Sequence, residues 1–138
     1  MHYRLLHIGI LIIRVGLGIM FLIHGLPKLF GGVEKWEKLG GAMQNFGIDF
    51  APTFWGFMAA FAESIGAIAL ITGLFFRPML SLLICTMLVA TVMHYSKGSS
   101  LPQITYPLEL MLVFVGLLVA GPGNYSLQEI FGKRDGQD

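Results

Sequence analysis

Charged residues are scarce in this chain, and their scarcity excludes most soluble folds. The 138 residues are only 12% charged and 55% hydrophobic, with a mean hydropathy of +0.73, whereas soluble domains average about 25% charged residues. There is no run of basic residues and the net charge is only +1, so the chain lacks the positive surface that nucleic-acid binding requires. The composition predicts an integral membrane protein whose main partner is the lipid bilayer.

Cysteine is almost absent as well, since the chain contains only Cys85. A single thiol cannot form an internal disulfide or the paired-cysteine centre of a thiol oxidoreductase. The sequence also lacks a glycine-rich dinucleotide motif and a set of cluster ligands, so any electrons would have to come from a separate soluble or membrane redox partner protein. Cys85 lies within an apolar run, and we interpret it as a small buried core residue.

Long apolar stretches fill most of the chain. At about 20 residues per crossing, four spans fit, and we predict an all-α integral membrane protein that forms a four-helix transmembrane bundle. The expected single domain covers residues 1–138, with spans at about 8–30, 52–76, 78–96 and 106–121. Residues 33–50 are too polar to cross. Their apolar side chains fall at helical spacing, which predicts a helix at the membrane interface, with a solvated loop as the alternative.

Small side chains recur at steps of three and four along the second predicted span. They are Ala59, Ala62, Gly66, Ala69 and Gly73. Such a stripe allows another helix to approach closely, which favours helix association in lipid. We therefore expect this span to be central, with the adjacent Glu63 facing protein.

Six ionisable side chains fall inside or at the ends of the predicted spans. They are Arg14, His24, Lys28, Glu63, His94 and Glu109. A charge in hydrocarbon is costly unless it has a partner or a water-filled cavity, so we expect these groups to meet in the interior. At a rise of about 1.5 Å per residue, His24, His94 and Glu109 fall in one layer near the 33–50 loop.

Arg14 and Glu63 are expected to form a structural ion pair between the first two spans, because a bidentate bond offsets part of the cost of burying both charges. The alternative is that Glu63 titrates or relays a proton, which a paired arginine would oppose. Both interpretations place Glu63 at a helix contact near the membrane midplane.

His24 and Lys28 share a helix face because they are four residues apart. A neutral imidazole beside a carboxylate suits a quinone carbonyl or a proton shuttle, although interhelical hydrogen bonding alone would also explain His24. His94 has a similar alternative, since it can simply extend to the interface beside Tyr95. We assign His24, Glu63 and Glu109 as candidate catalytic residues, and Lys28 and His94 as candidate substrate-binding residues.

A metal or haem site is a further alternative. His24, His94 and Glu109 form a competent ligand set, and two histidines could also hold a haem within a four-helix bundle. Their spacing carries no local ligand signature. We therefore expect no metal and leave the cofactor unknown, with a quinone ahead of haem or metal.

An ordered set of short motifs resembles the DoxX family of small four-span membrane proteins. The set comprises Arg14-x-Gly16, His24-Gly25-x-x-Lys28, Glu63-x-x-Gly66, Gly73-Leu74, Arg77-Pro78, His94, Glu109, Gly121-Pro-Gly123 and Ser126-Leu127. The resemblance implies an inner (plasma) membrane bundle with cytoplasmic termini and a link to redox functions. Relatives include a subunit of a thiosulfate:quinone oxidoreductase.

The leading hypothesis is a membrane redox accessory subunit whose His24, Glu63, His94 and Glu109 surround a quinone-like headgroup. Two other classes stay open. In a non-enzymatic scaffold or chaperone the same residues would join helices, and in a small solute or proton carrier Glu63 would be central. Monomer and homo-oligomer both remain compatible with the sequence.

Overall fold

The computed structural model describes residues 1–135 and contains no strand in that part of the chain. Four of its helices are long and apolar enough to cross a membrane. They are α1 (His2–Leu29), α3 (Pro52–Thr72), α4 (Phe76–Ser96) and α5 (Leu101–Ala120). The predicted all-α fold with four candidate transmembrane helices is therefore confirmed.

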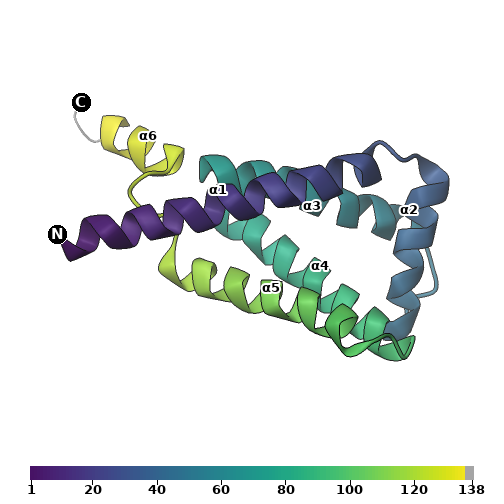
Figure 1. Cartoon of the computed structure of the whole chain (residues 1–138). Helices are drawn as coiled ribbons and strands as arrows, with labels where there is room; N and C mark the ends of the chain where they lie inside the picture. Colours follow the sequence, from purple (N-terminus) through teal and green to yellow (C-terminus); the bar gives the residue numbers. More distant parts are fainter. Residues whose placement is uncertain (136–138) are drawn as a thin grey trace.

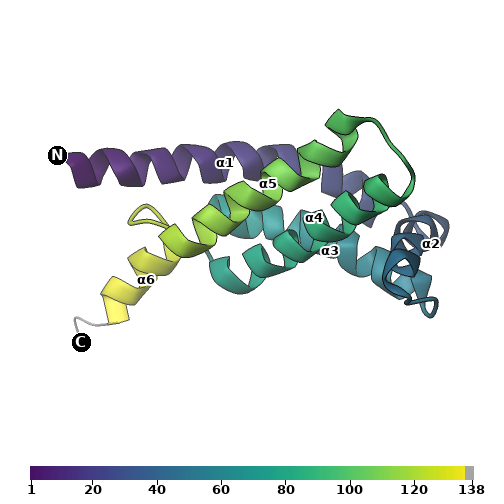
Figure 2. The same ribbon diagram turned by 90° about the horizontal axis from the view of Figure 1, so that it is seen from below.

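Three shorter elements complete the described chain, namely α2 (Val33–Gly40), the 3-10 helix η1 (Gly41–Phe46) and α6 (Leu127–Asp135). Figure 1 shows α2 standing across the ends of the long helices, and both views place the two chain termini at the opposite end (Figures 1 and 2). We call these the loop end and the terminal end. Residues 33–46 are thus helical, and their place at the membrane interface stays a prediction.

The long helices pack in the order α1, α3, α4 and α5. Half of the most apolar stretch of α3 is buried, against 22% for α1, 22% for α4 and 11% for α5. The small residues of α3 explain this, because a Cβ at Gly66 would meet the Leu83 side chain of α4 at 2.9 Å. The central place predicted for this helix is confirmed.

Two interior helix boundaries differ clearly from the sequence prediction. The chain leaves α3 at Gly73, which has a φ of 75°, a conformation that favours glycine. A Cβ at Gly73 would also collide with Ser126 and lie 2.7 Å from Arg14 Nη2. Helix α5 begins five residues earlier than expected, because Ser100 and Gln103 form a capping box that starts the helix before Pro107.

Arg14 ties the terminal end of the bundle together. Its side chain is fully buried, and Nε donates to the Leu70 carbonyl at 2.9 Å while Nη2 donates to the Ile71 carbonyl at 3.2 Å. Nη1 donates to the carbonyl of Pro122, in the segment after α5. The Leu70 and Ile71 carbonyls at the end of α3 lack part of their intrahelical bonding, so the guanidinium caps α3. Its bond to Pro122 fixes the chain beyond α5.

Replacement of Arg14 by Leu is expected to lower the free energy of unfolding by roughly 3 to 5 kcal/mol, because buried carbonyls lose their donors. Arg14→Lys should recover only part of the loss, since an ammonium lacks the planar fork of donors. Thermal unfolding in detergent measures both. Arg4→Leu, at an exposed position, is the control, and equal stability of the Arg14 and Arg4 variants would contradict this account.

Candidate functional site

Glu63 lies at the middle of α3 and pairs with Lys28 of α1. Lys28 Nζ lies 2.7 Å from Glu63 Oε2 and 3.1 Å from Oε1. The carboxylate side chain is 9% exposed and the lysine side chain 32%. Lys28 therefore compensates the buried charge of Glu63. The expected Arg14–Glu63 ion pair is wrong, because Arg14 bonds to backbone carbonyls at the C-terminal end of α3.

Close contact between α1 and α3 brings Lys28 within reach of Glu63. A Cβ at Gly25 would lie 2.9 Å from Ser64 Oγ and 3.0 Å from the Glu63 backbone, so only glycine allows α1 this near to α3. The Trp36 indole of α2 then donates to the Lys28 carbonyl at 3.0 Å. This bond holds the last turn of α1 under α2.

Helix α2 rests directly on the start of α3 through two more glycines. Any Cβ at Gly40 would overlap the Pro52 carbonyl, and any Cβ at Gly56 would overlap the Trp36 carbonyl. The rings of Trp36 and Phe57 add an edge-to-face contact with centroids 5.1 Å apart. Residues 33–46, which we call the roof, thus cover the loop end of the bundle.

A cavity of about 470 Å³ lies beneath this roof, between α3 and α4. Its volume falls within the range of about 300 to 1,000 Å³ that is usual for small-molecule sites. Most of its wall is apolar. Its polar lining consists of Lys28, Trp55, Glu63, Cys85, Thr86 and His94.

Trp55 and His94 flank the cavity at the same level. Gly66 of α3 contacts Leu83 of α4, Trp55 precedes Gly66 by eleven residues, and His94 follows Leu83 by eleven on the antiparallel helix. The Trp55 indole nitrogen is buried and has no hydrogen-bond partner among the described residues. Nδ1 of His94 contacts Ser99 Oγ at 3.3 Å, so Nε2 can serve a ligand.

The structure brings together only part of the predicted site. Glu63, Lys28 and His94 line the cavity, but His24 and Glu109 are exposed on the outer faces of α1 and α5. His24 turns away because it is adjacent to buried Gly25, one residue or about 100° around the helix, and its Nδ1 lies 2.7 Å from the Met20 carbonyl. Glu109 follows buried Pro107 by two residues, which rotates it to the opposite side of α5.

The separation of these residues also removes the alternative of a metal or haem site formed by His24, His94 and Glu109. Within residues 1–135, no three His, Cys, Asp or Glu side chains gather closely enough to hold a metal ion. Cys85 also needs correction, because it is exposed on α4 and lines the cavity instead of filling the core. Sequence reasoning missed Trp55, although an indole beside the polar end of a span is typical of a wet interface.

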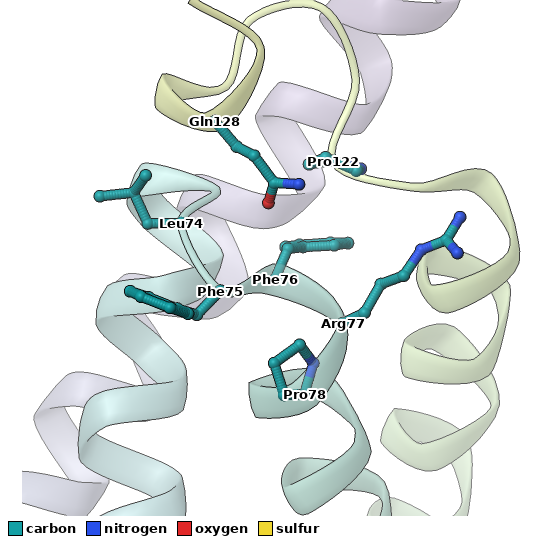
Figure 3. Close-up of a pocket in the computed structure, with 7 residues that line it drawn as sticks. All are labelled: Leu74, Phe75, Phe76, Arg77, Pro78, Pro122 and Gln128. Carbon is teal, nitrogen blue, oxygen red and sulfur yellow. The ribbon is translucent and has the colours of Figure 1, made fainter. Parts of the chain in front are cut away.

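A second hollow of about 480 Å³ lies at the terminal end, near the start of α4. Figure 3 shows Gln128 reaching toward it from α6 and the Arg77 guanidinium extending to one side. Arg77 is the only titratable residue among those that line it. This hollow therefore offers no carboxylate or imidazole for proton exchange, and the cavity at the loop end is the better candidate site.

The fold and the cavity define a multi-pass membrane protein with a roofed, mostly apolar site beside a buried ion pair. The DoxX family model matches residues 9–96, and the chain belongs to the DoxX family. It is 30% identical over 131 residues to the protein named "Putative oxidoreductase CatD" of Bacillus subtilis (strain 168), covering 94% of this chain and 92% of that protein. No solved structure matches the chain.

Loss of Lys28 should destabilise the bundle, because the buried Glu63 charge would be left without a partner. Lys28→Met is expected to lower the free energy of unfolding by roughly 2 to 4 kcal/mol, and adding Glu63→Met should restore much of the loss. Lys38→Met is the matched control, because the Lys38–Glu34 pair is exposed and worth about 0.5 kcal/mol or less. Equal effects of the two lysine substitutions in thermal unfolding would show that the buried pair has no special role.

Proposed function

We propose that this DoxX-family protein is an accessory subunit of a membrane redox system and holds a quinone-like headgroup in the cavity at its loop end. Membership of the family and the name of the Bacillus relative support a membrane redox-related role. The cavity supplies the further argument, because its size and lining suit an amphiphilic ligand with oxygen acceptors.

The unpartnered indole N–H of Trp55 carries the proposal. Buried donors in proteins nearly always have an acceptor, and the Trp55 nitrogen has none within residues 1–135. The wall around it is mostly apolar, which favours a ring or chain over a charged solute. The indole nitrogen has almost no exposed surface, so a quinone carbonyl would bond to it after a shift of the neighbouring side chains, and His94 Nε2 at the same level could bond a second oxygen.

Proton exchange is the second requirement of a quinone site. Reduction of a quinone to the quinol takes up two electrons and two protons. In our proposal the electrons come from a partner redox protein, and His94 is the cavity-lining side chain that can pass protons to the ligand oxygens, whereas the pairing of Glu63 with Lys28 opposes a relay role for Glu63. Lys28 also lines the cavity, but its charge is balanced by Glu63, so the pair adds no net positive charge beside the ligand.

The proposed location is the inner (plasma) membrane with both termini in the cytoplasm. Four basic residues mark the terminal end, namely Arg4, Arg77, Lys133 and Arg134, against three at the loop end, namely Lys35, Lys38 and Lys97, with Lys28 at the loop-end boundary of α1. This difference alone does not set the orientation, and the proposed direction is the one that membership of the DoxX family implies. The cavity would then open toward the outer face of the membrane.

Titration of the purified protein with a short-chain ubiquinone or menaquinone analogue tests the proposal. Saturable binding is expected, and Trp55→Phe should weaken it by roughly fivefold because one hydrogen bond is lost. Tyr106→Phe, at an exposed position on α5, is the control and should bind like the wild type. Absence of saturable binding, with Trp55→Phe altering thermal stability alone, would favour a structural scaffold instead.

A further inference from the structure

Glu109 occupies a position that the described chain leaves unexplained. It is the ninth of the twenty residues of α5 and is exposed, so it lies near the middle of the helix on a face open to lipid. The ion pairs found within residues 1–135 join Lys28 to Glu63 and Lys38 to Glu34. An ionisable group at this depth almost always faces protein or a water-filled cavity.

His24 is exposed at nearly the same depth. The rings of Phe21 and Phe114 stack with centroids 5.3 Å apart and fix the level of α1 against α5. His24 lies three residues beyond Phe21 toward the loop end, or about 4.5 Å, and Glu109 lies five residues from Phe114 toward the same end, or about 7.5 Å. The two side chains therefore differ in depth by only about 3 Å.

These two groups cannot meet within one chain. Five residues correspond to about 140° around a helix, and Phe114 faces α1, so Glu109 points away from the His24 of its own chain. Chains inserted in one direction place α1 of one copy antiparallel to α5 of another. An acid–base pair at matching depth is therefore available only between two molecules.

The glycines of the same two faces fit this arrangement. A Cβ added to Gly16 on α1 or to Gly116 on α5 would meet nothing within 4 Å, which leaves room for a close helix approach. Gly16 precedes His24 by eight residues and Glu109 precedes Gly116 by seven. Antiparallel helices that align His24 with Glu109 thus also align the two glycines, to within about one residue rise, ~1.5 Å.

We propose that the protein forms a two-fold symmetric homodimer in which α1 of each copy packs on α5 of the other, with His24 paired to Glu109 of the opposite copy. Helices α1 and α5 are neighbours on one side of the bundle through Phe21 and Phe114. In a dimer whose two-fold axis lies along the membrane normal, α1 of each copy therefore contacts α5 of the other at the same time. The cavity between α3 and α4 lies outside this interface, so the dimer is independent of the proposed ligand.

Cysteine cross-linking between two differently tagged copies in lipid bilayers tests the geometry. In a Cys85→Ser background, the proposed register places Met20 of one copy opposite Val113 of the other, and both positions are exposed. Met20→Cys and Val113→Cys copies should form a disulfide-linked dimer under mild oxidation. Leu88→Cys on α4, also exposed, replaces Val113→Cys as the matched control and should not cross-link.

A double-mutant cycle tests the pair itself. Glu109→Gln and His24→Gln should each weaken dimerisation in bilayers roughly tenfold, measured by single-molecule photobleaching, and the double variant should be little weaker than either single variant. Glu129→Gln, exposed on α6, should have no effect. A monomeric wild type, equal cross-linking to Leu88→Cys, or additive single effects would overturn the proposal and assign this face to lipid or to a different protein.

Discussion

A carboxylate at the middle of a membrane-spanning helix constrains everything around it. Glu63 is 7% exposed, and at that depth its charge requires a partner. Lys28 of α1 is that partner, and its ammonium reaches the carboxylate because Gly25 allows α1 and α3 to touch. This contact sets the position of α1 on α3 and brings its last turn within reach of the Trp36 indole.

Two polar anchors hold the bundle, and a mostly apolar cavity lies beside the anchor nearer the loop end. Arg14 fixes the terminal end by donating to carbonyls of α3 and of the segment after α5. The Lys28–Glu63 pair fixes α1 on α3 nearer the loop end, where α2 and η1 form a roof. Helices α3 and α4 separate beneath that roof, and the cavity with the unpartnered Trp55 indole lies there.

The sequence predicted the helices well because long apolar runs and a small-residue stripe are local signals. The sequence also predicted correctly that Glu63 faces protein. It indicated the wrong partner, Arg14, because depth estimates along single helices do not show which carbonyls at a helix end lack a hydrogen-bond donor. The faces of His24 and Glu109 depend on how each helix is rotated in the bundle. That rotation is set by contacts such as Gly25 on Ser64, between residues far apart in sequence.

The central claim is that a carbonyl-bearing headgroup sits between Trp55 and His94, and photoaffinity labelling with an azido-quinone in lipid bilayers tests it most directly. Mass spectrometry of the labelled protein should find the adduct on peptides that line the cavity, such as those with Met58 or Met93. Excess unlabelled quinone should suppress it. Labelling confined to the lipid-facing residues of α1 and α5, unaffected by competitor, would contradict the account.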